Sequence, residues 1–241
     1  MDITGSTALV TGANRGIGRH FATQLLERGA TKVYATARDE TAIDLPGVIP
    51  LRLDVTDPAS VAAAAALASD VDLLVNNAGV SFGQGLVTGD LDQLRLEFET
   101  NFWGLVSTTR AFAPVLAANG GGAILNVLSR LAWLTMPGAS GYAASKAAGW
   151  SLTDGVRLEL AGQGTQVTGL YLSGTDTDMM AGWDIPLNDP ADVVRVALDG
   201  LAAGALEVLA DDDTRETKRQ LSLDPRESYA AALEAATAAV R

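Results

Sequence analysis

The chain has 241 residues, of which 48% are hydrophobic and 19% are charged, and it carries a formal net charge of −12. This length and composition fit one α/β domain with a large core, and the negative charge argues against nucleic acid and anionic membranes as partners. There is no cysteine and only one histidine, His20, so disulfides, thiolate nucleophiles and cysteine metal sites are excluded, and neither another metal site nor a Ser-His-Asp triad is expected.

The start of the chain has no basic region ahead of an apolar stretch. No apolar run approaches the roughly 18 residues that a membrane span requires. We therefore expect a cytoplasmic protein.

Seven short runs typical of β-strands alternate with segments of helical length through most of the chain. Runs this apolar fit strands that are covered on both faces. The alternation predicts right-handed βαβ units in a parallel, doubly wound sheet of about seven strands with helices on both faces. No interdomain linker is evident, so residues 1–241 are expected to form one domain. The seven runs are residues 6–12, 32–38, 48–54, 71–79, 123–129, 166–172 and 205–211.

Three Asp-Pro pairs predict the starts of helices. Aspartate can accept hydrogen bonds from the free N–H groups of a helix end, and proline is pre-shaped for the first helical position. The pairs begin at Asp57, Asp189 and Asp224. The alanine-rich end, residues 224–241, is expected to form a C-terminal helix.

The sequence TGANRGIG, residues 11–18, joins the first predicted strand to the first predicted helix and contains Gly12, Gly16 and Gly18. Glycines permit a tight turn and a close backbone approach, while a helix N-terminus offers free N–H groups and partial positive charge to a pyrophosphate. At this junction the pattern predicts binding of a dinucleotide cofactor. A purely structural glycine turn is the alternative.

The end of the second strand bears on the choice of cofactor. An acid at this position usually favours NAD(H), because it accepts hydrogen bonds from the ribose hydroxyls. The sequence has Ala37 followed by Arg38, whose guanidinium can hold a 2′-phosphate, and Arg15 adds a second cation. NADP(H) is therefore expected in preference to NAD(H). A shift of one residue would bring Asp39 to the ribose instead, and a solvated surface role for Arg38 is the other alternative.

With these motifs in order, the chain resembles the short-chain dehydrogenase/reductase family over nearly its whole length. The resemblance rests on TGANRGIG, on LDVTD with Asp54, on NNAG at residues 76–79, on TNFWG with Asn101, and on NVLS followed by YAASK. The 13-residue step from Ser129 to Tyr142 matches the family's usual spacing. The resemblance implies a Rossmann-type fold, ligands at the carboxyl ends of the strands, and a homodimer or homotetramer.

The resemblance also implies the site residues. The catalytic residues would be Asn101, Ser129, Tyr142 and Lys146. The cofactor would contact Gly12, Asn14, Arg15, Gly16, Ile17, Gly18, Arg38, Asp54, Val55, Asn77, Ala78, Gly79, Tyr142, Lys146, Gly174, Thr175 and Thr177. In the family, the lysine also binds the nicotinamide ribose, and the asparagine helps to hold a water in a proton relay.

A free phenol has a pKa of about 10, so Tyr142 would be a feeble base but a competent proton donor near neutral pH. Lys146 follows four residues later on the same helical face, and its charge is expected to favour the phenolate. Ser129 would hydrogen-bond the substrate carbonyl oxygen while the tyrosine gives it a proton.

The segment YLSGTDTDMMAGW, residues 171–183, departs from the family pattern. Ser173 replaces the usual proline, and the threonine expected five residues later is one residue early, so either Thr175 or Thr177 could reach the cofactor, with Gly174 as the safer contact. Residues 173–188 are expected to form a substrate lid. The predicted substrate pocket is mostly apolar, with ordinary packing as the alternative for its apolar members, and comprises Ser129, Trp133, Tyr142, Met179, Met180 and Trp183.

These observations together predict an NADPH-dependent oxidoreductase that reduces a ketone or aldehyde, or oxidises a secondary alcohol, on a small hydrophobic or aromatic molecule. One alternative is an NADP(H)-binding regulatory or interaction module with little turnover. Another is an enzyme of the same fold that performs a different reaction.

Overall fold

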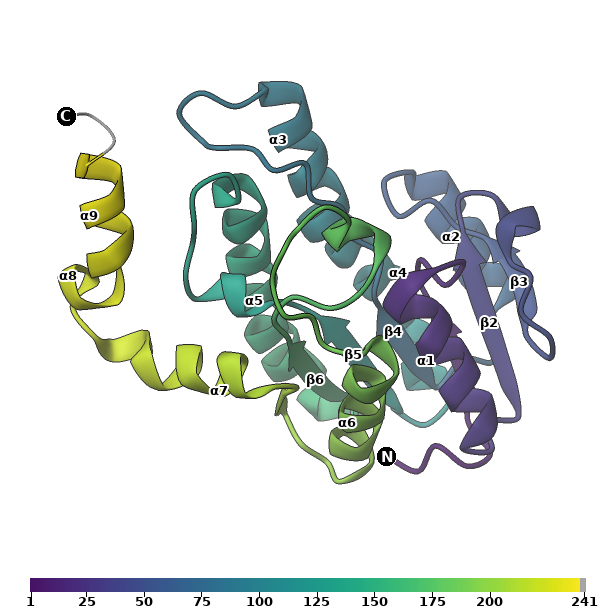
Figure 1. Ribbon diagram of the computed structural model, residues 1–241. Helices are drawn as coiled ribbons and strands as arrows, with labels where there is room; N and C mark the ends of the chain where they lie inside the picture. Colours follow the sequence, from purple (N-terminus) through teal and green to yellow (C-terminus); the bar gives the residue numbers. More distant parts are fainter. Residues whose placement is uncertain (239–241) are drawn as a thin grey trace.

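The computed structural model, which describes residues 1–238, shows a single-domain α/β fold around one parallel sheet (Figure 1). The strand order is β3-β2-β1-β4-β5-β6-β7, and every neighbouring pair runs parallel. All seven predicted strands and the doubly wound topology are confirmed. The strands are β1 (Thr7–Val10), β2 (Lys32–Ala37), β3 (Ile49–Arg52), β4 (Leu73–Asn76), β5 (Ala123–Val127), β6 (Gln166–Tyr171) and β7 (Glu207–Leu209).

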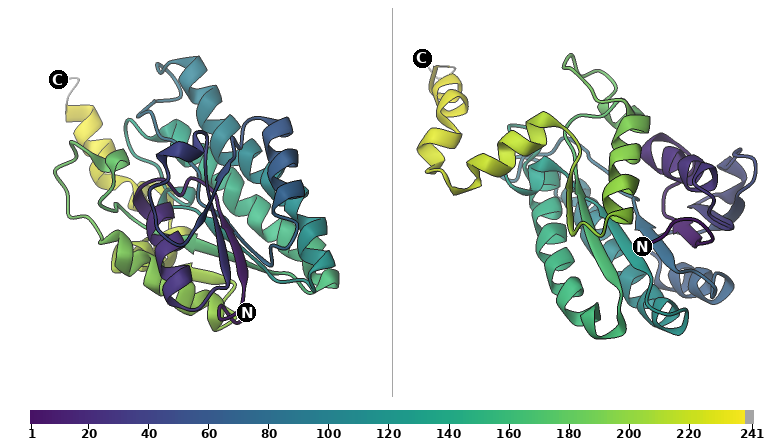
Figure 2. Two further views of the ribbon diagram at one scale, coloured as in Figure 1. Left: turned by 90° about the vertical axis from the view of Figure 1, so that its right-hand side faces the viewer. Right: turned by 90° about the horizontal axis from the view of Figure 1, so that it is seen from below.

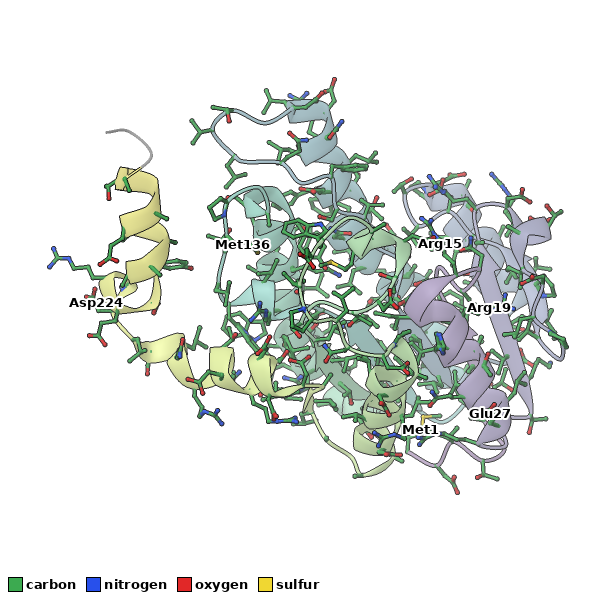
Figure 3. The ribbon with its side chains drawn as sticks, viewed as in Figure 1. Met1, Arg15, Arg19, Glu27, Met136 and Asp224 are labelled. Carbon is green, nitrogen blue, oxygen red and sulfur yellow. The ribbon has the colours of Figure 1, made fainter. Side chains whose placement is uncertain are left out.

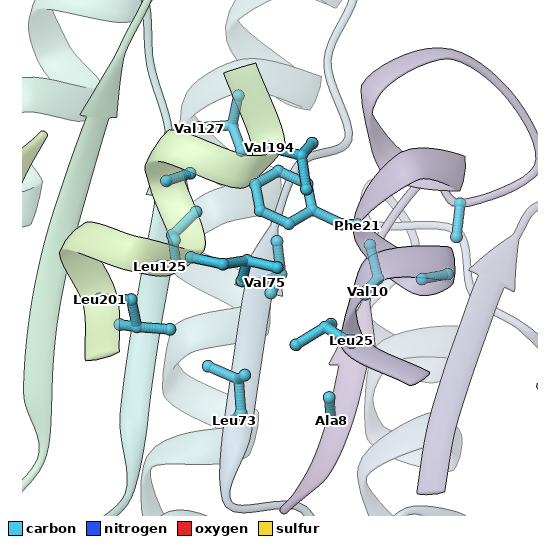
Figure 4. Close-up of a cluster of buried hydrophobic side chains, with 14 of the residues drawn as sticks. Ala8, Val10, Phe21, Leu25, Leu73, Val75, Leu125, Val127, Val194 and Leu201 are labelled. Carbon is cyan, nitrogen blue, oxygen red and sulfur yellow. The ribbon is translucent and has the colours of Figure 1, made fainter. Parts of the chain in front are cut away.

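Helices cover both faces of the sheet. On one face α1 (Gly16–Glu27) and α6 (Pro190–Ala202) contribute Phe21, Leu25, Val194 and Leu201 to a core that includes Val10 and Val75 (Figure 4). On the other face α2 (Pro58–Leu67), α4 (Gly104–Ala118) and α5 (Ser140–Leu160) pack against the intervening strand residues. Because successive strand residues point to opposite faces, the central strands are buried on both sides.

The remaining helices complete the loops around this core. A helix α3 (Leu91–Phe98) continues through a π-helical turn at Glu99–Trp103 into α4. Single π-helical turns are rare and are frequently found at functional sites. Short 3-10 turns lie at Glu40–Ala42, Arg130–Ala132, Ala161–Gln163, Asp178–Met180 and Gln220–Ser222.

All three Asp-Pro pairs begin helices, as predicted. The carboxylates of Asp57, Asp189 and Asp224 each accept a hydrogen bond from the backbone N–H two residues later, and a proline occupies the first turn each time. Capping by aspartate therefore fixes where α2, α6 and α8 start.

The expected continuous C-terminal helix over residues 224–241 is wrong in detail. After α7 (Asp212–Arg219) the chain forms a short α8 (Pro225–Ser228), breaks at Tyr229, and continues as α9 (Ala230–Ala238), while residues 239–241 lie outside the described part. The Tyr229 hydroxyl accepts a 3.2 Å hydrogen bond from the backbone N–H of Thr135. The arm formed by α7, α8 and α9 projects from the body, and Asp224 lies at the opposite side of the molecule from Arg15 (Figures 2 and 3).

None of the helices within residues 1–238 combines the length and the apolar character that crossing a bilayer requires.

Candidate active site

The predicted site residues follow the carboxyl ends of the strands and therefore gather at one edge of the sheet. The glycine turn follows β1, and Gly12 and Gly16 adopt φ values of 65° and 53°, in the left-handed region that favours glycine. Gly18 is required for another reason. A methyl group there would lie 2.5 Å from Asn77 Nδ2 and 2.9 Å from the Gly12 carbonyl carbon, and nearer still to the carbonyl oxygen.

The segment after β4 clamps this turn in place. Asn77 Nδ2 donates to the carbonyl oxygens of Thr11 (2.8 Å) and Gly12 (3.1 Å). In return, the Thr11 hydroxyl accepts from the backbone N–H groups of Asn77 and Ala78, both at 2.9 Å. The first N–H groups of α1 receive no hydrogen bond from the side chain of Arg15, the residue before the helix. These donors and the glycine surface fit a pyrophosphate.

Asn76 supports the sheet beneath the same edge. Its Oδ1 accepts from the Thr108 hydroxyl of α4 (2.7 Å), and its Nδ2 donates to Asn126 Oδ1 of β5 (2.9 Å). The Asn126 amide in turn donates to the Thr153 hydroxyl of α5 (3.0 Å). This buried network fixes the distance between the two central strands and the helices that carry catalytic residues.

At the ends of β2 and β3, the groups expected to face the adenosine ribose lie in distinct environments. Arg38 is exposed directly after β2 and forms no salt bridge within the described residues, whereas the Asp39 carboxylate accepts from the backbone N–H (3.0 Å) and hydroxyl of Thr41. The exposed side chains of Arg15 and Asp178 form a salt bridge of 2.8 Å. Asp54 lies after β3, where its carboxylate accepts from the N–H and hydroxyl of Thr56. Both hydrogen bonds to Asp39 end on its Oδ1, so one oxygen of this carboxylate is engaged locally.

Three of the four predicted catalytic residues meet where β5 ends and α5 begins. Ser129 follows β5 and is 7% exposed, and Lys146 is 6% exposed. Lys146 Nζ donates to the Val127 carbonyl oxygen (3.0 Å) and lies 5.5 Å from the centroid of the Tyr142 ring. The predicted one-turn pairing of Tyr142 and Lys146 on one helical face is therefore present, with the serine opposite.

Burial shifts both titrations away from their ordinary ranges. Burial raises the pKa of Tyr142 to about 12, a hydrogen bond with Ser129 opposes the rise, and the charge of Glu97 adds to it. Burial also lowers the pKa of Lys146 to about 8. The expectation that the charge of Lys146 favours the phenolate stays a prediction. A raised pKa favours the neutral phenol, which is the proton-donating form.

Asn101, on the π-helical turn, is buried and fully hydrogen-bonded. Its Oδ1 accepts from the backbone N–H of Val80 (2.8 Å), and its Nδ2 donates to the Val80 carbonyl (2.9 Å) and to the Ser145 hydroxyl (2.9 Å). Its side chain therefore positions the loop after NNAG against α5. A cavity of about 10 Å³, roughly the space of one water, is lined by Asn101, Lys146 and Thr108 among others.

The unusual loop after β6 is explained by Ser173. Its backbone N–H, which a proline would lack, donates to Asp211 Oδ2 (2.9 Å), and Asp211 also caps α7 through the N–H of Thr214 (2.8 Å). Although burial alone would favour the neutral acid, hydrogen bonds from Ser173 and Thr214 lower the pKa of Asp211. Ser173 and Asp211 together tie the loop after β6 to α7.

The structure separates the two candidate threonines. The methyl group of Thr177 lies against the glycine turn, 3.3 Å from where a Gly16 side chain would begin. Thr175 is buried and pairs with Asn188 in an isolated bridge. Gly174 lies close to the side chains of Leu187, Ile185 and Met180. Thr177 is therefore the threonine that faces the cofactor turn.

The predicted pocket residues divide into two groups. Trp133 stacks on Tyr171 with ring centroids 4.2 Å apart, and the Lys218 ammonium lies 4.5 Å from its centroid. This packing against β6 and α7 argues against a pocket role for Trp133. The sequence alone could not distinguish Trp133 from the other apolar residues of the predicted pocket. Met179 and Trp183 are each 45% exposed, and the methyl group of Met180 lies 3.5 Å from where a Gly174 side chain would begin.

Comparison with known proteins agrees with this geometry. The short chain dehydrogenase family profile matches residues 6–186. The chain belongs to the short-chain dehydrogenase family.

Among the relatives of this short-chain dehydrogenase is the 1-deoxy-11-beta-hydroxypentalenate dehydrogenase of Streptomyces avermitilis, 32% identical over 227 residues, with 88% of this chain and 84% of that protein covered. The D-erythrulose reductase of Gallus gallus is 30% identical over 239 residues and covers 93% of this chain and 96% of its own. The crystal structure of a short chain dehydrogenase from Burkholderia cenocepacia in complex with NADP superposes with a TM-score of 0.92 at 38% identity, over 96% of this chain and 98% of that one.

Two residues of this short-chain dehydrogenase site were missed by the sequence reasoning. Asp211 ends the seventh strand-like run, and its role depends on the contact with Ser173, 38 positions earlier. Glu97 is a fully buried acid on α3 beside the catalytic helix. The one available signal for Glu97 was an acid between two apolar neighbours, Leu96 and Phe98.

Proposed function

We propose that this short-chain dehydrogenase is an NADP(H)-dependent carbonyl reductase, or equivalently a secondary-alcohol dehydrogenase. The observation that carries the proposal is the convergence of Ser129, Tyr142 and Lys146 where β5 ends and α5 begins, with Asn101 holding the loop after β4. The Tyr142 phenol, neutral and half-buried at the start of α5, is suited to donate a proton.

When bound, a reduced nicotinamide would supply the hydride. The chain's own residues perform the remaining tasks. The Ser129 hydroxyl hydrogen-bonds the substrate carbonyl oxygen, and Tyr142 transfers its proton to the same oxygen as negative charge develops there. Lys146 and Asn101 line the small cavity that has space for a water, which fits re-protonation of the phenol from inside the protein.

Preference for NADP(H) is supported by the free Arg38 guanidinium and by the internal hydrogen bonds of Asp39. The test is the ratio of initial rates with NADPH and NADH for the unmodified protein and for Arg38→Ala. We expect the variant to lose roughly tenfold in kcat/KM for NADPH, as for one charge-assisted phosphate contact, and little for NADH. Arg226→Ala, which removes an exposed arginine on α8, is the matched control. A tenfold preference for NADH in the unmodified protein would overturn this cofactor assignment.

The substrate is proposed to be a hydrophobic or aromatic carbonyl compound. The proposed lid carries Met179, Met180 and Trp183. Within residues 1–238, no pair of basic residues for a carboxylate or phosphate group is evident beside the four predicted catalytic residues. The assay is NADPH oxidation with a panel of aryl ketones and diketones. If NADPH binds but none of these compounds causes its oxidation, the result would count against the reductase function.

Tyr142→Phe separates catalysis from a purely regulatory role in NADP(H) binding. It removes one hydroxyl from the site and leaves the glycine turn unchanged. Turnover should fall by at least about a hundredfold, in line with the loss of a general acid, while the dissociation constant of NADPH changes little. If the biological effect of the protein survives in this variant, the function is binding rather than turnover.

A further inference from the structure

Gln84 lies in the loop between β4 and α3, residues 77–90, and both polar atoms of its side chain are hydrogen-bonded. Its Nε2 donates to the Phe82 carbonyl oxygen (3.1 Å) and to Gln93 Oε1 on α3 (2.9 Å). Its Oε1 accepts from the backbone N–H of Asp90 (2.9 Å). One side chain thus joins the two sides of the loop to each other and to the helix that follows.

The loop folds closely around this side chain. A methyl group on Gly89 would lie 2.9 Å from Gln84 Oε1 and 3.1 Å from Gln84 Cβ, and nearer still to the Gly85 carbonyl oxygen. Compact loops that are packed by their own side chains are frequently functional. A loop that contains Gly83, Gly85 and Gly89 has many accessible conformations, and the bonds of Gln84 select one of them.

The backbone of Gln84 reaches the catalytic helix. Its carbonyl oxygen accepts from the N–H of Gly141 (3.1 Å), the residue before Tyr142. The first N–H groups of an α-helix have no acceptor within the helix, and Ala139, directly before α5, has no side chain that could cap them. The acceptor for the Gly141 N–H therefore comes from a distant segment of the chain.

Gly141 lies in close contact with both the loop and α3. A side chain there would overlap with Leu94 and with Glu97 Oε2, and it would begin 3.6 Å from the Gln84 carbonyl oxygen. Leu94 and Glu97 belong to α3, the same helix to which the Gln84 amide is bound through Gln93. The position of the first turn of α5 therefore depends on how α3 and the loop are held together.

We propose that Gln84 is a positioning residue for Tyr142: its side chain holds the β4–α3 loop in the shape that brings the Gln84 carbonyl oxygen to the start of α5. The proposal rests on the reductase function inferred above. Tyr142 is the third residue of α5, and the ends of helices fray unless they are held from outside. Displacing a reacting group by about 1 Å can cost roughly a hundredfold in rate, so the placement of this turn matters for proton donation.

The first test needs neither substrate nor cofactor. Amide hydrogen exchange is measured by NMR in the unmodified protein and in Gln84→Met, which keeps the length of the side chain and removes its amide. We expect the Gly141 N–H to exchange roughly tenfold faster in the variant, because its acceptor is no longer held in place. The N–H of Gly149, in the interior of the same helix, should exchange at an unchanged rate.

Two results of this measurement would overturn the proposal. One is equal exchange of the Gly141 N–H in the two proteins. The other is equal acceleration at Gly141 and Gly149, which would show a general loss of stability. Gln84→Glu, which keeps an acceptor for the Asp90 N–H but has no donor, replaces Gln84→Met if that variant does not fold.

Gln93 and Gln220 provide matched variants of the same chemical change. Gln93→Met removes one partner of the Gln84 amide, so the double variant should accelerate Gly141 exchange by less than the product of the two separate factors. Gln220→Met, on an exposed glutamine after α7, should have no effect. Fully independent effects of the first two substitutions would contradict the proposed route through α3.

The second test is the effect on carbonyl reduction. Gln84→Met should lower kcat by roughly tenfold to a hundredfold. The dissociation constant of NADPH should change little, because the bonds from Asn77 to the glycine turn are untouched. In a Tyr142→Phe background, Gln84→Met should lower the residual kcat no further, since its effect acts through the phenol.

The outcomes of the second test are distinguishable from failure of the proposed function. A further loss of kcat in the Tyr142→Phe background, or a parallel loss of NADPH binding, would show a merely structural role for Gln84. Accelerated Gly141 exchange with an unchanged kcat would contradict the link to proton donation. If the unmodified protein reduces no carbonyl compound, only the proposed function fails, because hydrogen exchange still decides whether Gln84 holds the start of α5.

Discussion

Gly18→Ala is the substitution whose cost the structure defines most closely. The new methyl group would overlap with the carbonyl group of Gly12, which is backbone and cannot rotate away, and would press on the side chain of Asn77. Alanine would gain about 1 kcal/mol of helix propensity, but overpacking of this kind costs about 1–3 kcal/mol. Weakening the two hydrogen bonds of Asn77 adds about 0.5–1.5 kcal/mol for each. We expect a net loss of about 1–5 kcal/mol in the free energy of unfolding.

The assay is urea unfolding followed by circular dichroism, together with the dissociation constant of NADPH measured by calorimetry. Gly162→Ala is the matched control, because a methyl group at Gly162 meets nothing within 4 Å. It should be neutral or stabilising by up to about 1 kcal/mol, because alanine lowers the conformational entropy of the unfolded chain. Gly18→Ala should also weaken NADPH binding, since the turn and the first N–H groups of α1 move together. If Gly18→Ala matches the control in both measurements, close backbone packing is not what the glycine provides.

Three other substitutions test the remaining contacts. The folded pKa of Lys146, about 8, is below its ordinary 10.5, so the unmodified protein should gain stability as pH rises between these values. Lys146→Met should abolish that rise and add about 1–3 kcal/mol to the free energy of unfolding at neutral pH, measured by urea unfolding across pH. Asp57→Ala removes the cap of α2 and should cost about 1 kcal/mol in the same assay, with no effect on turnover. Ser173→Pro removes the N–H donor to Asp211 and should cost about 1–2 kcal/mol; equal stability would show that this bond is dispensable.

The strands and the glycine turn could be predicted because their signals are local. Apolar runs bounded by turn residues define strands, and the spacing of Gly12, Gly16 and Gly18 reports a turn that only these residues can form. Asp-Pro pairs likewise mark helix starts within two residues of the group they cap. Motif spacing placed Tyr142 and Lys146 correctly, because one helical turn separates them.

The parts that the sequence did not reveal depend on contacts between distant segments. Trp133 follows the catalytic serine in sequence, but its ring is engaged by Tyr171 and Lys218 from β6 and α7. The environment of Tyr142 likewise depends on burial by segments that are distant in the sequence, and this burial raises its pKa. The periodicity of apolar residues predicts which side chains are buried, but it does not predict which residues they contact.

The loop over residues 77–84 explains how the cofactor turn and the catalytic helix keep a fixed relation. Four of its residues, Asn77, Val80, Phe82 and Gln84, each bond to a different element through side-chain or backbone groups. Their partners are, in order, the glycine turn, Asn101, Glu97 and Gly141. Both Asn101 and Glu97 are buried acceptors from this loop, so moving it would leave polar groups unsatisfied at two points. The loop is thereby held from the turn after β1 to the residue that precedes Tyr142, and the glycine turn and the start of α5 are positioned by one continuous segment.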